Sequence, residues 1–353
     1  MNKKDIKSMT LQEIEKDFAD MSERKFRAKQ VYQWLVKSVN NFDDMKNIPQ
    51  IFRDTLKEKY FIPHLKIKEK RISSDGTIKY LFELFDGELI ESVLMKYKHG
   101  YSICISTQAG CKMGCVFCAT GRNGFKRNLF ASEILNQIEI AQKDANIKIS
   151  NIVLMGMGEP LDNYDNVIKF LKLVSSKDNL NIGMRHISLS TCGLVDKIYK
   201  LSQERFQLTL SVSLHAPNDE IRNKIMKINN KWNVSDLITA CKKYIAKTGR
   251  RISFEYTMIK NLNDTPKCAM ELSKILKGML CHVNLIPLND CSFNEQFGKS
   301  SANRMYKFKD ILEKEGINVT IRRTLGKDIE AACGQLKGRY VKKEDGLRNG
   351  MRK

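Results

Sequence analysis

Three cysteines in the stretch ISTQAGCKMGCVFCATG are close enough along the chain to serve one inorganic centre. Cys111, Cys115 and Cys118 have the spacing C-x3-C-x2-C, and thiolates are ligands of both zinc and iron–sulfur clusters. A zinc knuckle or ribbon would need a fourth ligand, yet the next cysteine is Cys192 and no second C-x2-C pair follows. Three local thiolates therefore favour an iron–sulfur cluster with an open position, the arrangement that catalytic metals use to bind substrates.

The chain from about residue 101 onward alternates short β-rich runs with helical segments. The helical segments include SEILNQIEIAQKDA and NYDNVIKFLKLVSS. Strands that alternate with helices indicate parallel βα units, and the chain lacks the G-x-G-x-x-G of a dinucleotide-binding fold. Six or seven such units predict an α/β fold with a full or partial barrel. The β-rich runs are YSICIST, NIVLMG, HISLSTC, QLTLSVSLHA, RISFEYTMI, HVNLIPL and NVTIRRT.

Barrel enzymes place their chemistry at the carboxyl ends of the strands, and several polar residues fall there. Gly158 and Glu159 follow the second run, where a glycine allows close backbone approach and the carboxylate can accept a hydrogen bond from a ligand's ammonium group. Any one such residue alone is more often an ordinary loop residue. Together they predict a ligand site, whose further members at later strand ends are Ser190, Ser213, His215 and Asn289.

The first 100 residues differ from the barrel pattern. An Asp-Gly turn at residues 86–87 separates two alternating apolar runs, which is typical of a β-hairpin. Apolar residues before it fall near helical spacing, with basic residues opposite, and are expected to be core: Phe26, Val31, Trp34 and Leu35. The predicted order is a helical RNA-contacting module over 1–62, a β-hairpin segment over 63–100, a barrel over 101–335 and a basic tail over 336–353.

The cysteine spacing, with Phe117 before the last cysteine, resembles that of the radical SAM superfamily. This resemblance implies a [4Fe–4S] cluster on Cys111, Cys115 and Cys118, whose fourth iron binds S-adenosylmethionine (SAM). The motifs ICISTQAGC, GMGEPLDNYDNV, SVSLHAPND, NLIPLN and DIEAACGQL resemble, more narrowly, the RlmN/Cfr family of RNA adenine methyltransferases, from KFRAKQVYQWL to AACGQL. The family has a partial (β/α)6 TIM-like barrel. The SAM contacts it implies are Gly158, Glu159, Ser190, Ser213, Leu214, His215 and Asn289.

The family resemblance also implies that a cysteine carries the methyl group. Carbon 2 of adenine is electron-poor and cannot attack a sulfonium methyl group. Cys333 would therefore take a methyl group from one SAM, and a radical derived from a second SAM would activate it for addition to the base. Cys104 would attack the sulfur of Cys333, forming a transient disulfide and releasing the RNA, and Glu91 matches the family's proposed proton acceptor. Structural roles for these three residues are the alternatives.

Two branches of the family share this machinery, one methylating carbon 2 and the other carbon 8 of adenine. GMGEP and LHAP resemble the RlmN branch, since Cfr-type sequences tend to have alanine and serine at the positions of Pro160 and Ala216. We therefore expect methylation of carbon 2 in the peptidyl-transferase region of 23S rRNA and beside the tRNA anticodon. A Cfr-like carbon-8 enzyme and a non-catalytic ribosome-assembly factor are the alternatives. Lys227, where proline is usual, is expected to affect only local loop geometry.

The composition is compatible with an RNA substrate. The net charge is +21, and residues 222–251 hold nine basic side chains and one acidic one. A phosphate-binding surface and a merely lysine-rich one are both possible origins of such an excess. No run of about 18 apolar residues or secretory signal is present, so we expect a cytoplasmic monomer, reduced by flavodoxin or ferredoxin. The cysteines expected to be structural are Cys192, Cys241, Cys268, Cys281 and Cys291.

Overall fold

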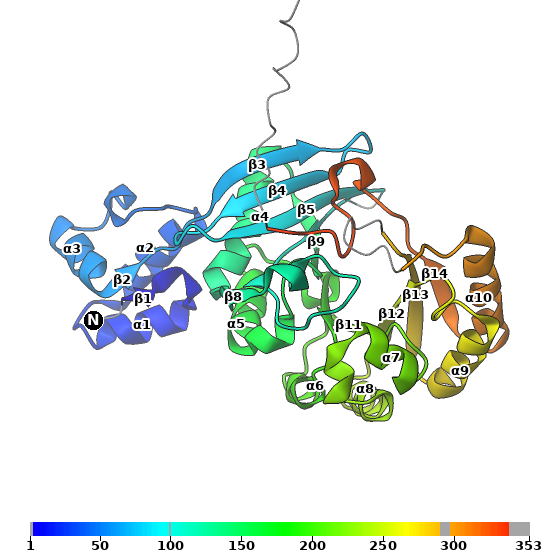
Figure 1. The fold of residues 1–353 in the computed structure, drawn as a ribbon. Coiled ribbons are helices and arrows are strands. Elements are labelled where there is room, and N and C mark those ends of the chain that lie inside the picture. The colour runs from blue at the N-terminus through cyan, green and yellow to red at the C-terminus, as the bar shows by residue number, and fades with distance from the viewer. Residues whose placement is uncertain (1–2, 99, 290–296, 339–353) are drawn as a thin grey trace, which may run out of the picture.

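One ten-stranded sheet organises most of the chain (Figure 1). The computed structural model describes residues 3–98, 100–289 and 297–338. Seven neighbouring strands are mutually parallel, and they coincide with the seven β-rich runs, which confirms the prediction of parallel βα units. In sheet order they are β14 (Asn318–Ile321), β13 (Cys281–Pro287), β12 (Ile252–Met258), β11 (Thr209–Ser213), β10 (Ile187–Thr191), β9 (Ile149–Leu154) and β6 (Gly100–Cys104).

Helices cover the outer face of the parallel strands, as in the predicted partial barrel (Figure 1). Strand β12 illustrates the sidedness, because its residues alternate between the two faces. Tyr256 packs outward on Phe308, with ring centroids 5.2 Å apart, while Glu255 and Thr257 line a cavity inside. The covering helices are α4 (Ala131–Ala145), α5 (Tyr164–Ser175), α6 (Val195–Gln203), α7 (Asp219–Ile225), α8 (Val234–Thr248), α9 (Pro266–Leu276) and α10 (Ala302–Lys314).

Three antiparallel strands extend the sheet beyond β6. Strand β5 pairs with both β4 and β6, so the expected boundary between residues 100 and 101 falls inside the paired strand β6 and does not separate two units. Alternating apolar residues indicate a strand but not its neighbour, which is why the sequence suggested an independent hairpin. The turn at residues 86–87 is confirmed. These strands are β3 (Lys66–Ile72), β4 (Ile78–Glu83) and β5 (Leu89–Tyr97).

The chain after β14 crosses to the antiparallel strands instead of forming a free tail. Asp328 accepts hydrogen bonds from Ser73 Oγ at 2.5 Å and from the Ser74 N–H at 3.0 Å. The Gly326 N–H donates to Asp75 at 2.9 Å. We call residues 325–338 the C-terminal segment. The predicted basic tail therefore begins too early, because residues 336–338 are docked; residues 339–353 lie outside the described residues.

The N-terminal residues form a helical lobe with its own hydrophobic core. Val31 and Leu35 are buried and Trp34 is partly buried, but Phe26 is 48% exposed and so is not core. The lobe docks on α4 through Lys7, whose buried Nζ lies 2.5 Å from Glu139 Oε2. Its elements are β1 (Lys4–Asp5), α1 (Leu11–Ala19), α2 (Lys25–Val36), α3 (Gln50–Lys59) and β2 (Tyr60–Phe61).

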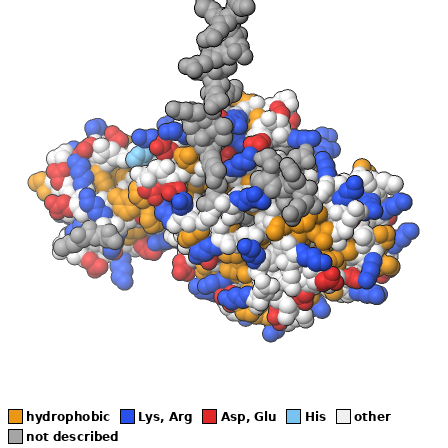
Figure 2. Space-filling model, in the orientation of Figure 1, with side chains coloured by type: hydrophobic (Ala, Val, Ile, Leu, Met, Phe, Trp, Pro, Cys, Tyr) orange, Lys and Arg blue, Asp and Glu red, His pale blue; other side chains and the backbone are white. Residues whose placement is uncertain are grey.

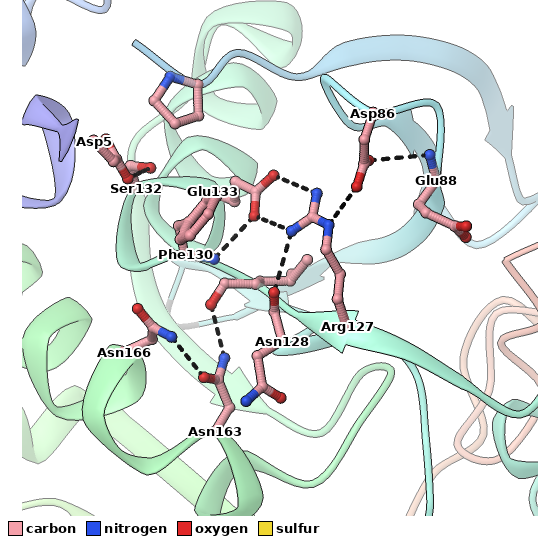
Figure 3. A network of polar contacts seen from close by, with 12 residues as sticks. Asp5, Asp86, Glu88, Arg127, Asn128, Phe130, Ser132, Glu133, Asn163 and Asn166 are labelled. Carbon is pink, nitrogen blue, oxygen red and sulfur yellow. Dashed lines mark hydrogen bonds and ion pairs between the residues drawn. The ribbon is translucent and has the colours of Figure 1, made fainter. Parts of the chain in front are cut away.

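Arg127 ties the antiparallel strands to the barrel (Figure 3). It lies on β8 (Phe125–Asn128), which pairs with β7 (Gln108–Gly110). Its guanidinium binds Asp86 in the β4–β5 turn and both oxygens of Glu133 in the first turn of α4, at 2.7 and 2.9 Å. This contact fixes the loop that carries the three clustered cysteines. Among the described residues, no helix is both long and apolar enough to span a bilayer.

Candidate active site

A cavity at the carboxyl ends of the parallel strands gathers most of the predicted site residues. The cysteine loop, the strand ends and the C-terminal segment all contribute to its lining. Leu214 is fully buried between two lining residues, Cys104 is buried nearby, and Glu91 lines a different cavity. The predicted residues that line the main cavity are Cys111, Cys115, Cys118, Gly158, Glu159, Ser190, Ser213, His215, Asn289 and Cys333.

The three clustered cysteines have the chemistry and spacing of cluster ligands. Burial raises the pKa of the Cys111 thiol to about 12 and also raises the pKa of Cys115, a penalty that binding of the thiolate to a metal would offset. Among the described residues, no three Cys, His, Asp or Glu side chains are close enough to share one metal ion. The C-x3-C-x2-C spacing of these cysteines along the chain suits thiolate ligands of an iron–sulfur cluster.

Gly158 and Glu159 follow β9, and Glu159 forms a hydrogen bond with the backbone just after β10. Gly158 has a φ of +99°, and a Cβ atom there would lie 2.5 Å from the Cβ of Gln108, so that only glycine fits. The two carboxylate oxygens of Glu159 accept hydrogen bonds from the N–H groups of Leu161 at 3.0 Å and Cys192 at 2.7 Å. Burial raises the pKa of this carboxyl group. The carboxylate is thus oriented by the backbone before any ligand binds.

His215 is fixed in one orientation and one tautomer. Its backbone is left-handed, with a φ of 56°, and its Nδ1 accepts a hydrogen bond from the Thr257 N–H at 2.9 Å. The ring of Phe117 meets the imidazole edge-on, with centroids 4.8 Å apart. Burial, assisted by the charge of Arg222, lowers the pKa of His215 to about 3. The imidazole is therefore neutral with its proton on Nε2, which can donate to a ligand in the cavity.

Arg222 supports the strand ends from inside the protein. Its side chain has no exposed surface, and its guanidinium donates to the carbonyl oxygens of Cys192 at 2.7 Å, Ser213 at 3.1 Å and Leu214 at 3.1 Å. In the sequence, Arg222 lies in the basic stretch of residues 222–251, for which a phosphate-binding surface is one expectation. That expectation is wrong for Arg222, because a fully buried guanidinium cannot reach a phosphate. Periodicity alone did not separate it from its exposed basic neighbours.

Cys333 lines the main cavity, and Cys104 is buried close enough to it for the two thiols to interact electrostatically. Cys104 ends β6 and is buried, whereas Cys333 is partly exposed on the C-terminal segment. Asn289 Nδ2 donates to the Cys333 carbonyl at 3.0 Å, and the Ala119 N–H donates to the Gly334 carbonyl at 2.7 Å. Burial, and then the charge of Cys333, raises the pKa of Cys104 to about 12. Every cysteine that the structure describes is a free thiol, so a disulfide between these two stays a prediction.

Two charged residues that the sequence did not single out line the same cavity. Arg322 follows β14, and its Nη1 lies 3.9 Å from Glu255 Oε2 on β12 and 3.5 Å from the sulfur of Met155. The charge of Cys333, more than any other group, raises the pKa of Arg322. One feature of the sequence could have pointed to Glu255 and Arg322. Each is a charged residue inside a β-rich run, RISFEYTMI or NVTIRRT, where an inward-facing side chain becomes buried.

A smaller cavity shares part of its lining with the main one. Asn289, Arg322 and Cys333 line both cavities, and the smaller one adds Tyr97, Arg323 and several apolar side chains. An aromatic ring and two guanidinium groups therefore lie beside the thiol of Cys333. This combination suits a nucleotide, since bases stack on aromatic rings and arginine binds phosphate.

Glu91 lies outside both of these cavities. Its Oε2 accepts hydrogen bonds from the N–H groups of Lys337 at 2.5 Å and Gly338 at 3.1 Å, and its Oε1 lies 3.2 Å from Lys79 Nζ. In this structure the carboxylate therefore holds the C-terminal segment in place. Its role as a proton acceptor stays a prediction, and that role requires the segment to release the carboxylate.

The other sequence features have varied locations. Cys192 lines the main cavity, whereas the thiols at positions 241, 268 and 281 are buried elsewhere; Cys291 lies outside the described residues. Lys227 begins a short 3-10 helix over Lys227–Asn230. A Cβ atom on Gly114, in the cysteine loop, would lie 3.4 Å from Lys227 Cδ. The effect of this lysine thus extends from its own turn to the cysteine loop.

Comparisons with known proteins assign the fold to a known class. The family model of the radical SAM superfamily matches residues 105–270, and the model of the "Ribosomal RNA large subunit methyltransferase N-terminal domain" matches residues 4–62. A radical SAM methyltransferase from Sphaerobacter thermophilus has a similar structure, with a TM-score of 0.88 and 40% identity over 95% of this chain and 100% of that one. The fold and the three-cysteine cavity are therefore those of a radical SAM enzyme, which uses a [4Fe–4S] cluster and SAM.

Curated relatives identify the family within this class. A "Probable dual-specificity RNA methyltransferase RlmN" from Clostridium novyi is 54% identical over 96% of this chain and 99% of the relative. A protein of the same description from Clostridium tetani is 52% identical over 95% of this chain and 96% of the relative. The chain belongs to the RlmN family of radical SAM RNA methyltransferases.

Proposed function

We propose that this chain methylates carbon 2 of adenosine in 23S rRNA and in tRNA, through a methyl group carried by Cys333. The observation that carries the proposal is that Cys333 lines the cavity that also contains the three clustered cysteines, with Cys104 buried close enough to interact with it electrostatically. A radical SAM enzyme without a cysteine-borne methyl group would need neither thiol there. The description of the relatives as dual-specificity enzymes supports two RNA substrates, and the motifs around Pro160 and Ala216 favour carbon 2.

The protein's part in this reaction is to hold two sulfurs where the methyl carbon passes between SAM and the base. When bound, the cluster and SAM supply a 5′-deoxyadenosyl radical that activates an S-methyl group. Asn289 holds the backbone of Cys333, which presents that group to carbon 2. Cys104 then attacks the sulfur of Cys333: the S–S bond forms as the S–C bond breaks, and the electron pair leaves with the carbon, which takes up a proton.

Cys104 must lose its own proton before that attack. Its pKa of about 12 makes the thiolate scarce near neutral pH, and the positive charge of Arg322 opposes the rise. We therefore assign Arg322 a supporting role at the thiol pair. Glu91 is the proposed proton acceptor, in a state where residues 337–338 no longer occupy its carboxylate.

The RNA would enter from the side of the smaller cavity. A base must leave its stack to reach a buried thiol, and Tyr97 and Arg323 lie where such a nucleotide would pass. Figure 2 shows lysine and arginine side chains spread over the face in view, mixed with acidic ones. The N-terminal lobe and the exposed basic residues of 224–251 are our candidates for phosphate contacts. We expect a cytoplasmic monomer that receives electrons from flavodoxin or ferredoxin.

Anaerobic turnover of the reconstituted protein tests the proposed function. The protein would be incubated with SAM, a reductant, and either a 23S rRNA fragment or tRNA, and the digested nucleosides analysed by mass spectrometry. We expect 2-methyladenosine together with 5′-deoxyadenosine and S-adenosylhomocysteine. Formation of 8-methyladenosine would instead assign the chain to carbon-8 chemistry. RNA binding without any of these products would favour the non-catalytic assembly factor.

A further inference from the structure

Glu255 lines the main cavity and has a carboxylate oxygen that no group among the described residues satisfies. The residue is 3% exposed and faces inward from β12. Its Oε1 accepts hydrogen bonds from Asn284 Nδ2 at 3.0 Å and from Ser253 Oγ at 3.2 Å. Its Oε2 is buried and accepts no hydrogen bond within the part of the chain that the structure describes. Such a group is rare in native proteins, because a buried hydrogen-bond acceptor without a donor lowers the stability of the fold.

The neighbouring Arg322 balances the charge of Glu255 without satisfying this oxygen. The distance of 3.9 Å between Arg322 Nη1 and Glu255 Oε2 is that of an ion pair and is too long for a hydrogen bond. The oxygen therefore needs a donor but not a second positive charge. A neutral hydroxyl group meets that requirement better than an ammonium group, which would leave Arg322 as an excess cation in the cavity.

The surroundings of Glu255 indicate which molecule would bring the hydroxyl group. Glu255 is in register with Ser213 on the adjoining strand, and its carbonyl accepts hydrogen bonds from the N–H groups of Leu214 and His215. It is thus bound directly to the segment predicted to contact SAM. A carboxylate is a common acceptor for ribose hydroxyl groups in nucleotide sites.

We propose that Glu255 is a further ligand-binding residue of the cavity, whose free oxygen accepts a hydrogen bond from a ribose hydroxyl of a bound adenosine. The adenosine is that of SAM or that of the RNA substrate; both present the same hydroxyl groups. Binding of the RNA adenosine rests on the proposed function, whereas binding of the SAM adenosine requires only the SAM chemistry of the superfamily. Asn284 and Ser253 orient the carboxylate, and the guanidinium of Arg322 lies beside it.

Binding of S-adenosylhomocysteine tests the first source without turnover. Isothermal titration would compare this ligand with its 2′-deoxy and 3′-deoxy analogues on the reconstituted protein. For the unsubstituted protein, loss of the bonded hydroxyl is expected to weaken binding roughly 10- to 100-fold, as for a hydrogen bond to a charged group. Glu255→Gln should weaken binding of S-adenosylhomocysteine by a similar factor. The variant should also bind the parent and deoxy ligands equally well, so that the effects of the substitution and of the missing hydroxyl are not additive.

Matched variants separate ligand contact from damage to the fold. Ser253→Ala removes a partner of Oε1 but leaves Oε2, so it should keep the discrimination between parent and deoxy ligands. Glu255→Asp keeps the charge beside Arg322 but withdraws the carboxylate, so it should lose the discrimination. Iron content and thermal unfolding would be measured for each variant, and Glu255→Asp serves if Glu255→Gln does not fold.

The RNA source is tested with a 2′-deoxy substitution at the target adenosine. If Glu255 contacts the RNA, affinity for S-adenosylhomocysteine is unchanged in Glu255→Gln, while the deoxy substitution lowers kcat/KM in the unsubstituted protein and not in the variant. The proposal is overturned if Glu255→Gln discriminates as well as the unsubstituted protein in both assays, or if neither assay shows any discrimination. If the proposed function is wrong about the methylated carbon, the titration with S-adenosylhomocysteine is unaffected.

Discussion

Individual residues of the site are oriented by the protein before a ligand binds. The backbone holds the carboxylate of Glu159, a backbone N–H selects the tautomer of His215, and the close approach of Gln108 leaves no space for a side chain on Gly158. Groups fixed in this way do not have to reorganise when charge develops near them. Substitutions at these positions should therefore affect SAM binding more than overall stability.

Gly158→Ala is expected to abolish measurable SAM binding, because the added Cβ would displace either the Gln108 strand or the glycine turn. Its left-handed backbone adds a strain of about 1–2 kcal/mol. Gly249→Ala is the matched control: Gly249 also has a positive φ, but nothing lies within 4 Å of its added Cβ. Calorimetry should show only the smaller loss of thermal stability that comes from backbone strain in the control, with SAM affinity intact. Equal affinities in both variants would contradict the close-approach argument.

His215 should make stability depend on pH in the acid range. Its pKa is about 3 in the folded protein, below the ordinary value of 6.5, so the unfolded chain binds the extra proton first. Stability is therefore full above pH 6.5 and falls as the pH decreases toward 3. The expected loss is roughly 2 kcal/mol between pH 6.5 and 5. Urea unfolding at both pH values should show a smaller loss in His215→Asn; identical pH dependence in the two proteins would refute the assignment.

At the scale of elements, the C-terminal segment decides where Cys333 lies. It forms hydrogen bonds with β4, β5 and the β3–β4 turn. Glu91 on β5 accepts from the backbone of the segment, and the segment's own Asp328 accepts from the turn. Both carboxylates bind backbone N–H groups, which are charge-assisted hydrogen bonds of above-average strength. The segment is thus a docked strap whose position sets the distance between the thiols of Cys333 and Cys104.

Two variants distinguish docking by Glu91 from proton transfer by Glu91. Glu91→Gln weakens two hydrogen bonds and leaves Lys79 without its charge partner, at a cost of about 1–3 kcal/mol. If docking matters, alkylation of Cys333 by iodoacetamide should become several-fold faster and its S-methylation by SAM slower. Asp328→Asn, which lies in the same strap but away from the thiols, should reproduce both effects. Proton transfer alone predicts unchanged alkylation and S-methylation in Glu91→Gln.

The sequence predicted the elements better than their connections. The seven parallel strands follow from apolar runs, whose burial against helices leaves a local pattern. The pairing of β5 with β6 and the docking of residues 325–338 depend on contacts between distant segments, which no local pattern records. The same limit applies in the site. The cysteines stand out by spacing, whereas Glu255, Arg322 and the buried Arg222 are recognisable only once the strands place them inside.

At the scale of the whole molecule, the N-terminal lobe is a separate core anchored to the barrel at α4. The anchor is the buried pair of Lys7 and Glu139, supported by Asn136, whose oxygen lies 2.5 Å from Lys7 Nζ. The two hydrophobic cores are otherwise distinct. Figure 1 shows the lobe on the opposite side of the molecule from β13 and β14, and none of its described residues lines the main cavity, so it should serve RNA binding and not the chemistry of SAM.

Lys7→Met should loosen this anchor, since breaking a buried ion pair costs about 3–5 kcal/mol. We expect RNA affinity to fall at least several-fold in a filter-binding assay, while S-methylation of Cys333 continues at the normal rate. Lys4→Met is the control, because Lys4 forms an exposed ion pair with Asp17 that contributes little. A loss of S-methylation in Lys7→Met, or equal RNA affinity in both variants, would show that the lobe has another role.

The central claim is that Cys333 carries the methyl carbon and Cys104 resolves the resulting bond to RNA. The most direct measurement is mass spectrometry of Cys104→Ala after anaerobic incubation with SAM and RNA. The variant should retain RNA joined to the peptide containing Cys333 through one methylene carbon, because no thiol remains to attack the sulfur. Free methylated RNA without such an adduct, or an adduct on a different residue, would contradict the account.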